Sequence, residues 1–276
     1  MASAPVPSSY PRSYFYFDAC SQALTAHFTQ PADHHIDAQA SSSLCSTGGH
    51  SVARVDKFSD GKFISFATGN TEVSAGYEDD EASNDTEAIA TVKGLNILNV
   101  VTADLVTAQT YSEHPTNASE GSVSMEGCKF ENLRILGQPV KMDFNYPLFD
   151  GIQTFKQAQE AYLQKGEFWQ SAKDPFRTGQ DLEPQGDTGA FLCSLIKGEI
   201  QVNAPGVQTV GHAIVIPNFG TIYLAEMMIS HAQRTFSMIR FNLDATVKVS
   251  GSVDVAVKAS GSVACGTTNG KQYPPH

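Results

Sequence analysis

TVKVSGSVDVAVKASGSVACG, residues 246–266, alternates in character from one residue to the next. Its odd-numbered residues are all apolar or glycine, and its even-numbered residues up to Ala264 are polar, charged or alanine. A period of two residues is typical of β-structure with one buried face and one wet face. The sequence therefore predicts a long alternating strand region at 246–265, close to the C-terminus.

A repeat inside this region limits how it can turn. The segments VKVSGSVDVA (247–256) and VKASGSVACG (257–266) agree at six of ten positions. A two-residue hairpin loop joins residues of opposite parity, so it would move the apolar residues to the other face. Because parity is kept, the region is either one long strand or strands joined by odd-numbered loops. Each Ser-Gly-Ser is a candidate bend.

The strand region has two possible partners. It can complete the protein's own sheet as a bent strand or hairpin, or it can pair with a neighbouring subunit by β-augmentation. An unpaired edge of this kind would otherwise favour aggregation. In the second case, assembly would depend on the alternating valines, namely Val247, Val249, Val253, Val255, Val257 and Val263.

The remainder of the chain is also rich in short strand-like runs separated by Gly, Ser and Asp turns. One section differs, because Thr154 and Gln157 match a capping box and apolar residues follow at helical spacing. We therefore expect an all-β fold, a sandwich or barrel of many short strands. The expected organisation is an extended arm at 1–13 and a single β-rich domain at 14–276, with a helical insertion at 152–173.

Composition and charge narrow the possible partners. The chain has 276 residues, 17% of them charged, and a formal net charge of −11. An acidic chain without a basic cluster argues against binding to nucleic acid or to anionic membranes. No apolar run reaches the roughly 18 residues of a transmembrane helix. The low charge and the Ser, Thr, Gly and Ala content favour an extracellular or cell-surface location, although no signal peptide is visible.

The five cysteines are widely spaced, and none forms the CxxC pair of a structural zinc site. An oxidising compartment would allow two disulfides. The pair closest in sequence, Cys20 and Cys45, is the first candidate for a bridge. The alternative is that several cysteines are buried thiols that act as small apolar residues.

The segment Asp33-His34-His35-Ile36-Asp37 has the composition of a metal site. In an extended chain Asp33, His35 and Asp37 share one face, and carboxylate and imidazole groups together suit a divalent ion. His27 and His50 could each add a ligand. The alternative is a solvated loop.

An acidic run near residue 80 offers oxygen ligands that suit calcium, among them Asp79, Asp80 and Asp85. Their order does not match the EF-hand loop, and the alternative is again a solvated loop. No other cofactor is expected.

Two carboxylates lie inside apolar runs, Asp104 within 100–110 and Glu226 within 221–230. A carboxylate in a buried strand must be paired, hydrogen-bonded or protonated. The candidate partners are Arg134, Arg234 and Arg240. Each carboxylate is therefore either part of a structural ion pair, an outward-facing residue, or a functional group in the mouth of a barrel.

Two passages carry a family resemblance. ATVKGLNILNVVTADLVTAQTYSE (90–113) is followed by SVSMEGCKFENLRILGQPV (122–140), and the second passage is VIPNFGTIYLAEMMISHAQRTFSMIRFNL (215–243). Together they resemble the choice-of-anchor P type of bacterial exported proteins. The resemblance implies a β-rich extracellular domain without a defined activity, so no catalytic residue is carried over from it.

The sequence contains no G-x-S-x-G elbow, no Walker loop and no G-x-G-x-x-G motif. The leading hypothesis is therefore a non-enzymatic, exported or surface structural protein that self-associates into oligomers or filaments by terminal strand exchange. One alternative is an enzyme or small-ligand-binding β-barrel with carboxylates in its mouth. The other is a calcium- or metal-dependent adhesin.

Overall fold

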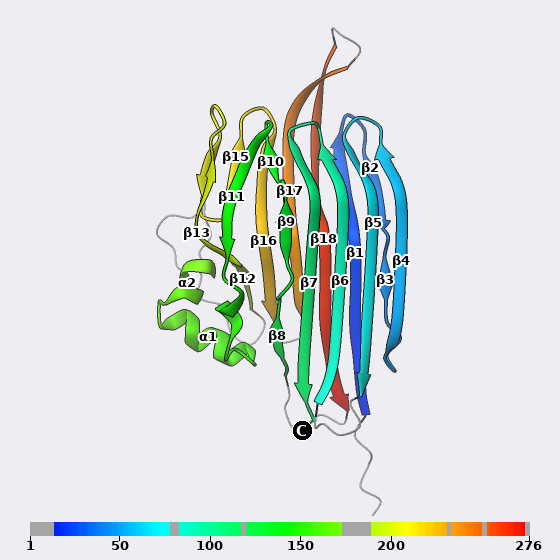
Figure 1. Cartoon of the computed structure of the whole chain (residues 1–276), viewed down its shortest axis with the longest axis vertical. Helices are drawn as coiled ribbons and strands as arrows, with labels where there is room; N and C mark the ends of the chain where they lie inside the picture. Colours follow the sequence, from blue (N-terminus) through cyan, green and yellow to red (C-terminus); the bar gives the residue numbers. More distant parts are fainter. Residues whose placement is uncertain are drawn as a thin grey trace, which may run out of the picture.

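The structure is a computed structural model that describes residues 14–77, 83–116, 120–172, 189–230, 233–249 and 253–273. Two antiparallel sheets pack face to face as a sandwich, and a small helical insertion lies at one side (Figure 1). The predicted all-β class and the helical insertion are thus confirmed. Of the two predicted architectures, the sandwich is the one observed.

Sheet 1 has the strand order β14-β15-β16-β17-β18-β1-β2, with β12 paired to β16 and β3 paired to β1. Its strands are β1 (Tyr14–Gln30), β2 (His34–Gln39), β3 (Ser42–Ser43), β12 (Ala190–Ser194), β14 (Gln208–Val210), β15 (Ala213–Ile216), β16 (Gly220–Ser230), β17 (Arg234–Val249) and β18 (Val253–Tyr273).

Sheet 2 has the order β13-β11-β10-β7-β6-β5-β4, with β8 and β9 paired to β7. Its strands are β4 (Gly49–Asp60), β5 (Ile64–Tyr77), β6 (Ser83–Ile97), β7 (Val101–Pro115), β8 (Ser122–Ser124), β9 (Lys129–Glu131), β10 (Arg134–Ile135), β11 (Gln138–Phe144) and β13 (Ile196–Val202). Long central strands from both sheets enclose one core, in which the largest fully buried side chains include Phe28, Phe236 and Phe241. Burial of each such ring contributes roughly 1.5–3 kcal/mol.

The alternating C-terminal region forms a hairpin within sheet 1. Strand β17 pairs with β18 up to Val249 and Val253, and the three residues between them, 250–252, lie outside the described part of the chain. A connection of three residues is odd-numbered, as the parity argument requires. The second Ser-Gly-Ser, residues 260–262, runs through β18 without a turn.

Strand β18 lies between two strands of the same chain. It pairs with β17 on one side and with β1 on the other, from Tyr14 opposite Tyr273 to Gln30 opposite Lys258. Of the predicted assembly residues, Val257 and Val263 are fully buried and Val255 is partly buried. The side chains of Val247, Val249 and Val253 lie outside the described part.

The helical insertion consists of η1 (Tyr146–Phe149), α1 (Phe155–Leu163) and α2 (Glu167–Ala172). The predicted capping box is present: Thr154 Oγ1 accepts a hydrogen bond from Gln157 N, and the Gln157 side chain accepts one from Thr154 N. Aromatic rings of the helices surround Phe191 on β12, with centroid distances of 5.2–5.6 Å. The helices therefore share the core of the sandwich.

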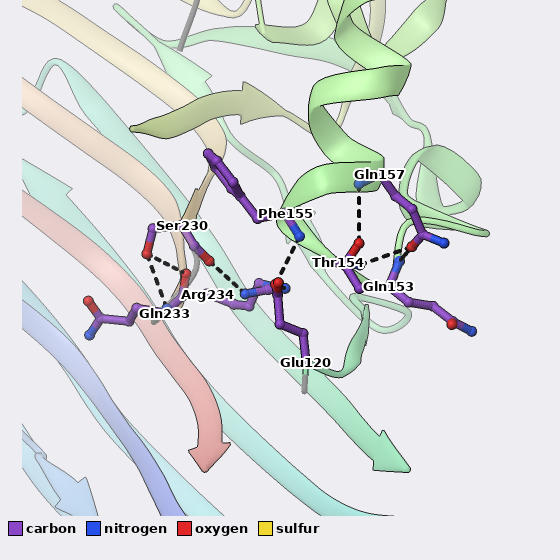
Figure 2. A network of polar contacts seen from close by, with 8 residues as sticks. All are labelled: Glu120, Gln153, Thr154, Phe155, Gln157, Ser230, Gln233 and Arg234. Carbon is purple, nitrogen blue, oxygen red and sulfur yellow. Dashed lines mark hydrogen bonds and ion pairs between the residues drawn. The ribbon is translucent and has the colours of Figure 1, made fainter. Parts of the chain in front are cut away.

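Glu120 fastens α1 to sheet 1 (Figure 2). Its Oε2 accepts hydrogen bonds from Phe155 N at 2.8 Å and from Arg234 Nη2 at 2.9 Å. Arg234 also donates to Ser230 O, at the other end of the β16–β17 connection. A carboxylate at the first helical N–H is favoured by the helix dipole, so Glu120 stabilises the start of α1 and joins it to the start of β17.

The predicted disulfide is not formed, because Cys20 and Cys45 are both free thiols. In the register of β1 with β3, the residue opposite Cys20 is Ser43, so Cys45 lies two residues beyond the facing position. Cys45 instead pairs with Gly48 in a tight turn. The alternative expectation, that several cysteines are buried thiols, is confirmed for Cys128, Cys193 and Cys265.

In the described part of the chain, no helix has the length and apolar character needed to cross a membrane.

A substitution at Gly261 tests the packing of β18. A Cβ atom there would lie 2.5 Å from Phe241 Cζ and 2.5 Å from Thr25 O. We expect Gly261→Ala to lower the free energy of unfolding by about 1–3 kcal/mol, as overpacked cores do. At Gly76, which is also in a strand, a Cβ meets nothing within 4 Å. Urea denaturation should therefore show Gly76→Ala at or above wild-type stability, and equal losses in the two variants would contradict this packing.

Candidate functional site

Glu226 lies in a stretch of β16 where strand alternation breaks down. Residues 224–227 are all buried, and Ala225 has a positive φ of 53°. This left-handed residue changes the phase of the strand, so Glu226 is only 3% exposed. Such burial requires partners for both carboxylate oxygens.

Two basic side chains provide these partners. Glu226 Oε1 accepts from His212 Nε2 and from Arg240 Nη2, each at 2.9 Å, and Oε2 accepts from Arg240 Nε at 2.5 Å. The guanidinium of Arg240 stands 3.7 Å from the centre of the Tyr223 ring, a cation–π geometry. Of the three arginines that the sequence offers as partners, Arg240 is thus the one that pairs with Glu226.

The cluster keeps Glu226 ionised. Burial alone would raise the pKa of the carboxyl, but the hydrogen bonds from His212 and Arg240 and the charge of Arg240 outweigh it and lower the pKa below its ordinary value. The carboxylate also raises the pKa of Arg240, against the opposing effect of burial.

The ionised carboxylate fixes the tautomer of His212. Because a carboxylate only accepts hydrogen bonds, Nε2 of His212 must carry a proton. In the neutral ring, Nδ1 is then the acceptor left for a ligand. Sequence reasoning did not identify His212, which lies in the short turn between β14 and β15 and has no local pattern around it.

A cavity of about 460 Å³ opens beside His212. It lies between the α1–α2 corner and the neighbouring strands of the two sheets. The described residues that line it are Asn145, Lys165, Gly166, Glu167, Gln170, Ser171, Ser194, Ile196, Lys197, Gly198, Gly211 and His212. The buried ion cluster therefore borders an open space and is not enclosed by core on every side.

The nucleophiles near this cavity are engaged in structural hydrogen bonds. Ser194 Oγ donates to Leu224 O at 2.8 Å and accepts from Ile196 N at 3.1 Å. Burial raises the pKa of the Cys193 thiol well above its usual range, and that thiol donates to Met227 O. The arrangement suits binding and orientation of a polar ligand better than nucleophilic attack on it.

Asp104 does not join this site. It is exposed on β7 and accepts a hydrogen bond from Asn132 Nδ2 at 2.6 Å. The other two arginines are also engaged elsewhere, since Arg134 donates to Gly137 O and Arg234 pairs with Glu120. Of the three alternatives that the sequence left open for Asp104, the outward-facing residue is the one observed, because the alternation in its part of β7 turns the side chain outward.

The predicted metal residues are only partly brought together. Asp33 and His35 lie close to His27, whereas Asp37 lies outside that group. His50 is on β4, where its Nε2 is 2.9 Å from Glu72 Oε1.

The calcium prediction rests mainly on residues outside the described part, Asp79 and Asp80. Its third member, Asp85, lies in β6 opposite Gly76 and Glu113.

The pH dependence of stability tests the ionised state of Glu226. Its pKa is lower in the folded protein than the value of about 4.3 expected on unfolding, so the stabilisation is present above that pH and is lost as the pH falls through the folded pKa. We expect Glu226→Gln to lower the free energy of unfolding by roughly 3 kcal/mol at pH 7, and by less near pH 3.

The matched control is Glu72→Gln, which removes an exposed carboxylate that also faces a histidine. It should change stability little at either pH. Urea denaturation measures the free energy of unfolding at each pH. If Glu226→Gln lowered it by the same amount at both pH values, the ion cluster would not be the cause of the loss.

Comparison with known proteins gives one match. A family model described as Domain of unknown function (DUF8256) matches residues 15–180 and 169–230. No curated protein and no solved structure matches the chain. The match does not bear on the resemblance to the choice-of-anchor P type, which stays a prediction. Because the matched residues cover more than half of the sequence, the chain belongs to the DUF8256 family.

Proposed function

We propose that the cavity beside His212 binds a small hydrophilic molecule that carries an acidic group. The observation that carries this proposal is the position of the buried His212–Glu226–Arg240 cluster at the wall of a 460 Å³ cavity. Ionisable groups with perturbed pKa values beside a cavity are typical of functional sites. The volume falls within the range of small-molecule sites.

The lining favours a hydrophilic ligand. Among the described lining residues Ile196 is the one aliphatic side chain, and the others are polar, charged or glycine. Pockets for drug-like molecules are lined mostly by apolar and aromatic groups. A molecule rich in hydroxyl or carboxyl groups, such as a sugar acid or a hydroxycarboxylic acid, matches these polar walls better.

The charge of the lining favours an acid. Among the described lining residues, Lys165, Lys197 and His212 are basic and Glu167 is acidic. The Glu167 carboxylate already accepts a hydrogen bond from Asn145 Nδ2 at 3.3 Å. This local excess of basic groups contrasts with the net charge of −11 for the whole chain. An anion would therefore be attracted to this part of the surface more than to the rest.

Within this proposal Glu226 is a positioning residue. It holds the His212 ring through Nε2, and Arg240 in turn holds the carboxylate in place with two hydrogen bonds. The ligand itself would meet His212 and the lysines. A fixed ring loses little freedom when it binds, which raises affinity.

Thermal melting with defined probes tests this function. Glucuronate, galacturonate and citrate are the acidic probes, and glucose is the neutral one. We expect at least one acid to raise the Tm of the wild type, since a ligand at 100 times its Kd adds about 2.7 kcal/mol. Lys197→Ala and His212→Ala should reduce or abolish that shift.

Lys93→Ala is the matched control, because it removes the same charge from an exposed site on sheet 2. It should keep the full ligand-induced shift. A panel in which no acid changes the Tm, or in which Lys93→Ala and Lys197→Ala lose the shift equally, would contradict the proposal.

We also propose that the protein self-associates through the end of the β17–β18 hairpin, as the sequence predicts for an exported or surface protein. Pairing with β16 ends at Leu243 and pairing with β1 ends at Lys258, but β17 and β18 continue together to Val249 and Val253. This ribbon extends past the other strands (Figure 1). Its outer edges have no strand partner among the described residues, so they are open to β-augmentation.

A shortened ribbon tests self-association. Replacing residues 246–256 with Asn-Gly would join Ala245 to Val257, which face each other across the hairpin, and would keep the pairing of β18 with β1. We expect a folded monomer by analytical ultracentrifugation, whereas the wild type forms oligomers. Equal sedimentation of the two proteins would contradict assembly through the ribbon.

A further inference from the structure

We infer that His27, Asp33 and His35 form a site for one divalent transition-metal ion, such as Zn²⁺, at the β1–β2 edge of sheet 1. One ligand atom from each residue lies within 4.8 Å of the other two. The site is separate from the cavity beside His212 and does not depend on the function proposed for it.

The hairpin of β1 and β2 brings the two imidazoles together. His27 and His35 are register partners across the strands, and their rings stack with centroids 3.9 Å apart and planes 9° apart. Asp33 lies in the connection just before β2, and its Oδ1 is 2.6 Å from His27 Nε2. Donors that share a zinc ion stand roughly 3.2–3.5 Å apart, so small rotations of these side chains would close the set.

The backbone beneath the site is anchored by buried neighbours. Ala26 and Phe28, the neighbours of His27 on β1, are buried in the core. His34 precedes His35 and faces the other way, where its ring stacks on Phe28 at 4.7 Å and its Nε2 is 3.1 Å from Asp60 Oδ2. Strand alternation therefore turns His34 away from the other two histidines and leaves His27 and His35 together on the outer face.

The donor set selects the class of ion. Two imidazoles and one carboxylate suit Zn²⁺, Co²⁺, Ni²⁺ and Cu²⁺, whereas Ca²⁺ and Mg²⁺ prefer oxygen ligands alone. His27 is partly exposed, and Asp33 and His35 are exposed, so water can occupy the remaining coordination positions. Asp37 is not a member of the group, but it lies two residues along β2 on the same face and adds negative charge there.

Calorimetry with untagged, chelator-treated protein tests the site. We expect one equivalent of ZnCl₂ to bind to the wild type. His35→Ala and Asp33→Asn should each weaken binding by roughly tenfold or more, since even disturbing a group that supports a ligand costs 10–100-fold. Because both residues are exposed, neither substitution should disturb the fold, and circular dichroism of the two variants should match that of the wild type.

His50→Ala is the matched control, because His50 is also an exposed histidine next to a carboxylate, on β4. It should bind zinc as the wild type does. Electron paramagnetic resonance of the protein with one equivalent of Cu²⁺ should show coupling to two imidazole nitrogens, and to one in His35→Ala. No zinc binding by the wild type, unchanged affinity in His35→Ala, or equal losses in His50→Ala would overturn the inference.

Discussion

Backbone hydrogen bonding of β18 to both of its neighbours is the constraint on which sheet 1 depends. The last described strand lies between β17 and β1, so the first and last strands of the domain meet inside the sheet. Both proposed sites follow from this arrangement. Strand β18 faces residues of both, because its Ser260 is the register partner of His27 on β1 and its Ser262 is the register partner of Arg240 on β17. Loss of β18 would therefore remove support from the metal ligands and from the ion cluster together.

Local patterns predicted the local structure well. Alternation identified the strands, and the capping box at Thr154 identified the start of α1. Parity limited the C-terminal region to one long strand or to strands joined by odd-numbered loops, and of the two Ser-Gly-Ser segments the one at 260–262 lies inside β18. The sequence could not predict which strands pair across long separations. Strand β1, one of the two partners of β18, is more than two hundred residues away from it in the chain. The break in alternation at Ala225 was also not predictable, because nothing in the sequence marks an alanine that adopts a positive φ.

In the candidate site, too, local sequence pointed to some residues, whereas others could be found only from their contacts in the fold. Glu226 could be singled out because a carboxylate in an apolar run needs a partner, and Arg240 was among three possibilities. The same argument could not decide which way Asp104 faces, and the structure places it on the outer side of β7. His212 gave no signal, because its role comes only from the contact with Glu226. For the metal ligands, spacing along one strand grouped Asp33 with His35 and left His27 and His50 as two further candidates. The register of β1 with β2 is what places His27, and not His50, opposite His35.

The pairing of β1 with β18 also affects how the chain is made. Residues 14–30 leave the ribosome long before Val253–Tyr273 are synthesised, so one edge of β1 lacks its final partner for most of translation. Pairing across such a separation is slow to form, because a large loop must close first. During that interval the exposed edge of β1 can pair with other chains. Protection of this edge of β1 until β18 has been made is therefore a requirement of folding during synthesis that the finished sandwich does not reveal.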